Sequence, residues 1–267
     1  PPPEGHPLVG LPNVVHVPHL GASTREAERE VGIQIVGQVV SALRGTDFSY
    51  SVNMPFQIEG DFAAVRPYLQ LAETLGRLHS GLADEPVRHL EIEVFGETVG
   101  GMVRAIAAGL LKGILESRSE VPVNYINAPT VAHELGITTT QTAGLNSLDY
   151  PNLIACRAEW DGGRRLLAGV LFGGSEPRIV QVDDYRLEAR PEGIVLVMQN
   201  KDVPGVIGRV GLILSEYNVN IGEWRLGRNQ PGGEALSFIS LDSEPDPEVL
   251  EKLAGFEAVT RAKIVHL

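Results

Sequence analysis

Residues 193–267 alternate between strand-like and helix-like apolar patterns in a fixed order. Along the chain the order is strand, helix, strand, strand, helix, strand. The segments lie at 194–198, 204–217, 219–226, 235–241, 247–254 and 259–265. This order is the ferredoxin-like βαββαβ arrangement. The sequence therefore predicts a compact module here, set off from the preceding chain by Pro191-Glu192-Gly193.

The middle of the chain mixes both kinds of pattern. Helical spacing of apolar residues occurs in 67–82, 101–115 and 128–135, and strand-like runs occur in 89–95, 152–160, 164–172 and 178–190. Asp161-Gly162-Gly163, between two of these runs, is a strong hairpin signal. The Ala and Gly in 101–115 predict a helix packed closely on its neighbour. We expect a mixed α/β domain over residues 53–190.

The first 52 residues predict a separate piece of structure. Val14–Val17 is a short strand-like run, and Ser23 with Glu26 forms a capping box before a helix that extends to Leu43. The apolar positions of that helix keep helical spacing, which predicts one buried face. Residues 46–66 indicate a connector with one or two short strands. The fold class is thus α+β, with domains at 1–52, 53–190 and 193–267.

Composition limits the partners of this chain. Its 267 residues carry a net charge of −12, which disfavours nucleic acid and anionic membranes as partners because phosphates would be repelled. Cys156 is the single cysteine, so an intrachain disulfide and a Cys-rich metal site are excluded. The single cysteine fits a reducing, cytosolic setting, so we expect a cytoplasmic protein. No apolar run approaches the roughly 20 residues of a membrane span. Because the chain opens on Pro1 without an initiator Met, we expect a fragment or a processed product.

No complete active site is evident. The chain lacks a Gly-x-Gly-x-x-Gly or Walker motif, and its seven histidines form no metal-binding pair, so we expect no resident metal. His19 is the one candidate for catalysis, because it lies between a strand-like run and a capped helix and imidazole suits proton transfer near neutral pH. An ordinary loop histidine is the alternative interpretation.

Three polar residues of the last module suit a free amino acid. Pro204 presets a helix entry, and the helix N-terminus offers N–H groups to a carboxylate. Asp202 can accept from an ammonium group, and Asn200 and Asn220 can each donate and accept. Turn formation and helix capping are the alternative roles of these residues.

Two arginines of the 178–190 segment suit a phosphorylated anion. Arg178 and Arg190 are an even number of residues apart, although a turn is expected between them near Asp183-Asp184. The guanidinium fork binds phosphate well. A solvated, salt-bridged strand is the alternative.

Residues 12–24 read Pro-Asn-Val-Val-x-x-Pro-His-x-Gly-Ala-Ser-Thr, which is similar to the end of the catalytic region of D-2-hydroxyacid dehydrogenases. The Gly-Ala-Ser-Thr form resembles the D-3-phosphoglycerate dehydrogenases in particular. The resemblance implies that His19 is the general acid/base of hydride transfer to NAD and that residues 1–52 are a remnant of the catalytic substrate-binding domain. The dinucleotide-binding fold would lie upstream, so we expect this chain alone neither to bind NAD nor to turn over.

The rest resembles the long form of the same enzymes. Tyr125–Pro129 and Arg178–Val182 are similar to segments of their intervening allosteric domain, and residues 193–267 resemble an ACT domain. The resemblance implies that Arg178 and Arg190 bind a phosphorylated substrate anion. It also implies that Asn200, Asp202 and Asn220 bind L-serine or a related amino acid across a two-chain interface, in a homo-oligomer.

The function that this implies is the regulatory and oligomerisation part of an enzyme that oxidises 3-phosphoglycerate to 3-phosphohydroxypyruvate in L-serine biosynthesis. Family members often have a ring-bearing residue where Asn200 stands, so the effector stays open. A free-standing amino-acid-sensing ACT module without a catalytic parent is the alternative. A regulatory piece of L-serine dehydratase is a third reading, disfavoured by the single Cys156.

Overall fold

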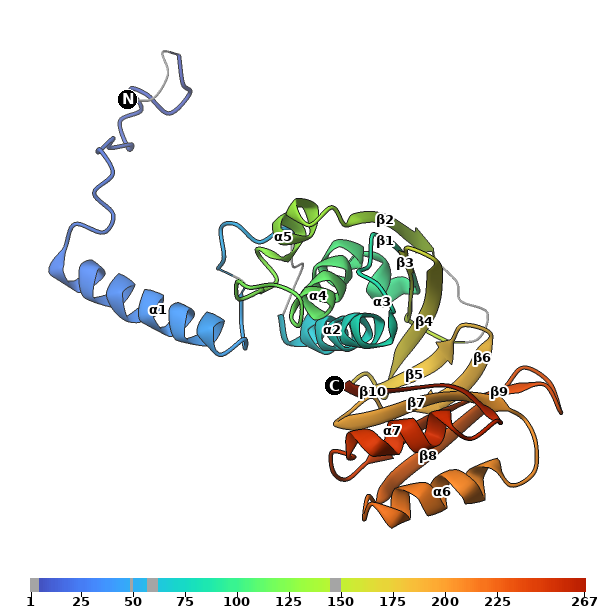
Figure 1. Cartoon of the computed structure of the whole chain (residues 1–267). Helices are drawn as coiled ribbons and strands as arrows, with labels where there is room; N and C mark the ends of the chain where they lie inside the picture. Colours follow the sequence, from blue (N-terminus) through green and yellow to red (C-terminus); the bar gives the residue numbers. More distant parts are fainter. Residues whose placement is uncertain (1–4, 49, 57–61, 145–149) are drawn as a thin grey trace. The chain divides into compact units, whose positions relative to one another are not determined.

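The computed structural model describes residues 5–48, 50–56, 62–144 and 150–267. Contacts divide the chain into two compact units, residues 1–52 and 53–267, and each is described by itself (Figure 1). Among the described residues, we find no helix with the length and apolar character that a membrane span requires.

The described part of the first unit contains one helix, α1 (Arg25–Leu43). Its N-cap is Thr24, whose Oγ1 accepts from Ala27 N at 3.2 Å, so the capping box expected at Ser23 is wrong by one residue. The strand expected at Val14–Val17 is also wrong, because a strand needs a partner ladder and the described part of this unit supplies none. No residue of α1 is buried, which corrects the predicted buried face.

The middle module, residues 53–190, is built on a six-stranded sheet in the order β2-β1-β3-β4-β5-β6. Its strands are β1 (His89–Phe95), β2 (Thr138–Gly144), β3 (Leu153–Trp160), β4 (Gly163–Phe172), β5 (Glu176–Val182) and β6 (Tyr185–Ala189). Among the strands that the structure describes, only β1 and β2 pair in parallel. The predicted β3–β4 hairpin is confirmed, and β5 turns into β6 at Asp183, which adopts a positive φ of 50°.

Four helices accompany this sheet: α2 (Phe62–Leu82), α3 (Glu97–Gly100), α4 (Val103–Leu115) and α5 (Ala128–Glu134). The close packing expected of 101–115 is confirmed, because Gly113 and Gly76 bring the backbones of α2 and α4 together. A Cβ on Gly113 would fall well inside the van der Waals contact distance from the Glu73 carbonyl oxygen.

Three details of the middle module differ from expectation. Helix α2 begins at Phe62, before Pro67, because Phe62 and Val65 are buried. The described residues of 46–66 accordingly contain no strand. Strand β2 was not anticipated, since all but one of its residues are exposed and it shows no apolar alternation. Its β-branched Thr residues were the signal for it.

The C-terminal module, residues 193–267, confirms the predicted βαββαβ order (Figure 1). It consists of β7 (Ile194–Lys201), α6 (Val206–Glu216), β8 (Ile221–Arg228), β9 (Glu234–Leu241), α7 (Pro247–Ala254) and β10 (Val259–His266). The four strands form an antiparallel sheet in the order β10-β7-β9-β8.

The two faces of this sheet pack differently. Leu196, Met198 and Ile239 form a core with α6 and α7. Val197 and Phe238 instead join the hydrophobic core of the middle module. The segment 191–193 therefore leads from one sheet to the other inside a single compact unit.

Candidate functional site

The end of β7 and the loop that leads to α6, together called the β7–α6 connection, hold two of the predicted effector residues. Asn200 is only 2% exposed, and its Nδ2 donates to the Lys201 carbonyl at 2.8 Å. Its Oδ1 is buried and accepts from no donor among the described residues. A buried amide oxygen without a donor is costly. The β7–α6 connection thus contains an acceptor suited to an incoming N–H group.

Helix α6 begins where this loop ends. Gly205 adopts a left-handed φ of 92°, a conformation that favours glycine, and it offers no side chain to cap the helix. The first N–H groups of a helix have no partner within the helix and carry a partial positive charge. This end of α6 is therefore suited to a carboxylate.

Asp202 ties the loop to the β8–β9 hairpin. Its Oδ2 accepts from Gly232 N at 3.0 Å and from Arg228 Nη1 at 3.3 Å, and its own N–H donates to the Gly233 carbonyl. The main-chain N–H of Gly232 and then the Arg228 guanidinium hold the pKa of Asp202 below its ordinary value. Asp202 is therefore an ionised carboxylate at neutral pH, and its described hydrogen bonds use one of its two oxygens.

Asn220 lies far from this loop within one chain. Asn200 pairs with Ala235 at one end of β9, whereas Ile221, next to Asn220, pairs with Leu241 at the other end. Six residues of strand span about 20 Å. Asn220 Nδ2 donates instead to Asp242 Oδ2 at 2.6 Å. Asn200 and Asp202 thus lie two residues apart with different partners, and the structure separates Asn220 from both.

The two candidate anion-binding arginines are neighbours across a strand pair. Ile179 of β5 pairs with Ala189 of β6, which puts Arg178 and Arg190 opposite each other, one residue further along. Arg178 is 13% exposed in its side chain, donates to Glu176 Oε2 at 2.8 Å and lies over the Phe172 ring. Arg190 is exposed.

His19 lies in an exposed segment of the first unit, before α1. The described residues before it form turns, bends and irregular chain. The expected strand on that side is therefore wrong, whereas the helix after His19 is present as α1.

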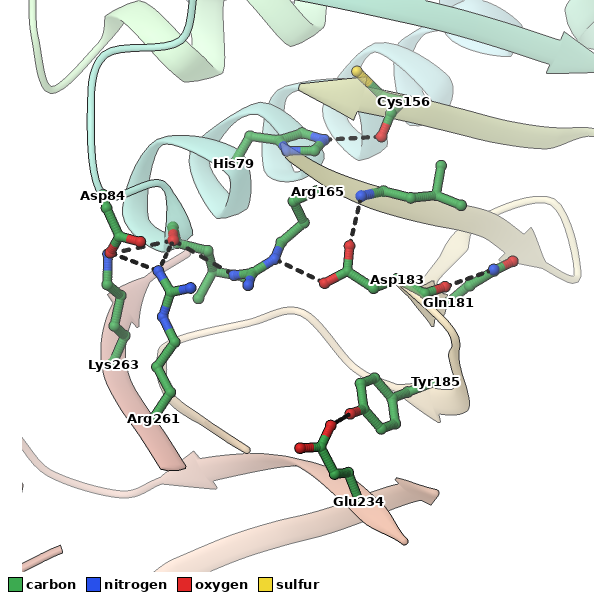
Figure 2. A network of polar contacts seen from close by, with 12 residues as sticks. His79, Asp84, Cys156, Arg165, Gln181, Asp183, Tyr185, Glu234, Arg261 and Lys263 are labelled. Carbon is green, nitrogen blue, oxygen red and sulfur yellow. Dashed lines mark hydrogen bonds and ion pairs between the residues drawn. The ribbon is translucent and has the colours of Figure 1, made fainter. Parts of the chain in front are cut away.

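A buried polar network was missed by the sequence reading (Figure 2). His79 of α2 is fully buried, and its Nε2 donates to the Cys156 carbonyl at 3.1 Å. Burial lowers the pKa of His79 to about 3, so the ring stays neutral. Burial also raises the pKa of the Cys156 thiol, which suits a structural role.

A second part of this network lies where the two modules meet (Figure 2). Arg165 of β4 donates to Asp183 at 3.1 Å, and Arg261 and Lys263 of β10 contact Asp84, just after α2. The only sequence signal for it was the spacing of Arg261 and Lys263, since alternate residues on a strand share a face.

Comparison with known proteins gives a consistent set of relatives. Residues 64–183 match the D-3-phosphoglycerate dehydrogenase intervening domain. The whole chain is 34% identical to the D-3-phosphoglycerate dehydrogenase of Archaeoglobus fulgidus over 269 residues, covering 51% of that protein. The chain is therefore similar over its whole length to part of a D-3-phosphoglycerate dehydrogenase.

Two further relatives agree. The D-3-phosphoglycerate dehydrogenases of Methanocaldococcus jannaschii and Bacillus subtilis are 32% and 31% identical to the chain, each over 266 residues and all of its length. The chain spans about half the length of the curated relatives it matches, and it corresponds to their C-terminal part.

Proposed function

We propose that this chain is the regulatory and oligomerisation part of an NAD-dependent D-3-phosphoglycerate dehydrogenase, which oxidises 3-phosphoglycerate to 3-phosphohydroxypyruvate in L-serine biosynthesis. Its role there is to bind a small amino acid, with L-serine as the first candidate, at the β7–α6 connection. The observation that carries this proposal is the buried Asn200 Oδ1 without a donor, in the strand end that leads to the uncapped start of α6.

An amino acid supplies the two groups that this connection lacks. Its ammonium group would donate to Asn200 Oδ1 and to the ionised Asp202, and its carboxylate would accept from the first N–H groups of α6. The hydroxyl group of serine can serve as both donor and acceptor. The loop is therefore chemically suited to the end product of the pathway in which the family acts.

Asn220 can join this site only from a second copy of the chain, because it lies about 20 Å away in its own chain. Strand β8 is an edge of its sheet, with backbone groups that can pair with another strand. We therefore place the effector between two copies. Light scattering should give a dimer or larger, and Asn220→Ala should weaken serine binding as Asp202→Ala does. A monomer that binds serine without any effect of Asn220→Ala contradicts the shared site.

The pair Arg178 and Arg190 is the second candidate site, for a phosphorylated substrate anion. Its support is their placement at neighbouring strand ends, since Ile179 pairs with Ala189 and each arginine lies one residue beyond that pair. Titration with 3-phosphoglycerate should show saturable binding that Arg178→Gln abolishes and Arg225→Gln leaves unchanged. Binding that survives Arg178→Gln would place the anion elsewhere.

In this proposal, NAD binds to the part of the enzyme that corresponds to the half of the relatives outside this chain. A dinucleotide binds at the edge of a mostly parallel sheet with a glycine-rich turn. Among the described residues only β1 and β2 pair in parallel, so the described sheets do not fit this cofactor. We expect no NADH production from the chain with 3-phosphoglycerate and NAD, and detectable NADH would contradict the assignment. His19 would act as general acid/base only together with that other half.

Calorimetric titration of the full chain tests the effector proposal. L-serine should bind saturably, with glycine and L-alanine binding more weakly. Asn200→Ala and Asp202→Ala should each lower the affinity at least tenfold, whereas Glu257→Gln, which removes only an exposed pair with Lys201, should not. No binding at millimolar serine, or binding unaffected by both loop variants, refutes the proposal.

A free-standing amino-acid sensor remains the alternative. Similarity to the dehydrogenases over the entire chain, including residues 1–52, favours the enzyme part over the sensor.

A further inference from the structure

The middle and C-terminal modules pack closely at two glycines. A Cβ on Gly81 of α2 would lie 2.8 Å from the side-chain atom Val265 Cγ1 of β10, and a Cβ on Gly227 of β8 would lie 2.5 Å from the Arg186 carbonyl oxygen of β6. Either Cβ would lie closer than ordinary van der Waals contact. The two modules are therefore packed through glycines at both places.

The first of these contacts continues into a cluster of cations around the end of α2 (Figure 2). Leu82 is the last residue of α2, and its carbonyl accepts from Arg261 Nη2 at 2.9 Å, Lys263 Nζ at 3.3 Å and Arg165 Nη1 at 3.4 Å. Lys263 also donates to the Ala83 carbonyl at 2.9 Å. The last carbonyls of a helix lack partners within the helix and carry a partial negative charge, so cations stabilise them.

Two of these three cations come from the neighbouring module. Arg261 and Lys263 belong to β10, and Asp84 Oδ1 holds both in place at 2.6 and 2.9 Å. Arg165 is only 6% exposed in its side chain. The remaining cavity among Leu82, Arg165 and the two β10 cations is about 10 Å³, which is no larger than one water molecule. The cluster is thus a closely packed contact between the two modules, with no room for a ligand.

Strand β10 also pairs with the end of β7. Its first residue, Val259, pairs with Asn200, and Arg261 pairs with Gln199, with a register shift between them. The same strand therefore contacts the end of β7 and, two and four residues later, the end of α2.

We propose that β10 is a mechanical coupling element: Arg261 and Lys263 form a C-cap of α2 supplied from the other module, so that the two modules unfold as one cooperative body and a displacement of β10 is transmitted to α2. The coupling is a property of the fold and does not depend on which ligand the loop binds.

The two tryptophans give one reporter to each module, Trp160 in β3 and Trp224 in β8. Trp160→Phe and Trp224→Phe each leave one fluorescence signal in the full chain. In the parent the two signals should report the same urea midpoint, as one cooperative transition requires. In the double variant Arg261→Met/Lys263→Met the two midpoints should separate by about 0.5 M urea or more.

The matched control is Lys201→Met/Lys252→Met. It removes the same charge, but the ion pairs of these residues, with Glu257 and Glu216, lie inside the C-terminal module. Its two midpoints should stay together. Different midpoints in the parent, or coincident midpoints in the Arg261/Lys263 double variant, overturn the proposal.

If the double variant does not fold, hydrogen exchange of a single variant provides a second test. In the single variant Lys263→Met, amides in the last turn of α2 should exchange at least tenfold faster than in the parent. Lys252→Met should leave that exchange unchanged. Unaltered exchange in Lys263→Met overturns the coupling.

Discussion

Substitution of Gly113 by alanine should destabilise the protein, although alanine favours helices. A Cβ on Gly113 would lie 2.9 Å from Arg77 N, where ordinary contact is 3.4–4 Å, and closer still to the Glu73 carbonyl oxygen. Both obstacles are backbone atoms of α2, which no rotamer change can move. The closer of the two contacts sets the minimum, so helices α2 and α4 must separate by about 1 Å or more along a seam of fully buried side chains.

Two opposing terms set the size of the effect. Replacing glycine by alanine inside a helix is favourable by about 1 kcal/mol. Overpacking a well-filled core costs about 1–3 kcal/mol, and the upper end applies because backbone rather than side chains must move. The net loss is about 2 kcal/mol of unfolding free energy, which for a unit of this size lowers Tm by about 4–8 °C.

Gly208 of α6 is the matched control, because a Cβ there meets no atom within 4 Å. Gly208→Ala keeps the helical gain without the clash and should raise Tm by about 2–4 °C. Thermal unfolding of both variants by circular dichroism gives the comparison. A Gly113→Ala protein as stable as the parent would refute the reasoning, since it would mean that α2 and α4 are not in backbone contact.

Three further predictions concern buried or closely packed groups. His79→Gln should reduce the loss of unfolding free energy that the parent shows as the pH falls below about 6.5. The pKa of His79 is about 3 in the folded state and 6.5 when unfolded, so the unfolded chain binds the extra proton and stability falls as pH drops from about 6.5 toward 3. Urea midpoints of parent and variant between pH 7 and 4 measure this, and equal slopes would contradict it. Cys156 should react with a thiol reagent only after urea unfolding, because it is buried and its thiolate is disfavoured; rapid labelling of the native chain would be the opposite result. Gly227→Ala should lower the unfolding midpoint because its Cβ meets the Arg186 backbone, whereas Gly222→Ala on the same strand meets first a movable carboxylate oxygen of Asp242. Equal midpoints for these two variants would show that β6 and β8 tolerate separation.

The local patterns of the sequence determined most of the elements. Alternation placed His89–Phe95, and a helix-like pattern placed 247–254, because such periods depend on near neighbours only. The βαββαβ order followed from the same kind of signal. The Gly and Ala of α4 indicated close packing before any partner helix was known.

Only the tertiary structure decided which residues meet. Asn200, Asp202 and Asn220 are close in sequence, yet the pairing of β9 with both β7 and β8 puts Asn220 at the opposite end of the sheet. In the sequence, Arg261 and Lys263 are two cations of a strand like any others. In the folded chain they contact the end of α2, which lies about 180 residues earlier. Strand β2 has an exposed, non-alternating sequence and exists because β1 offers it a ladder. Periodicity is a property of short stretches of chain, whereas strand pairing and helix capping between modules depend on contacts between distant residues, which no local pattern records.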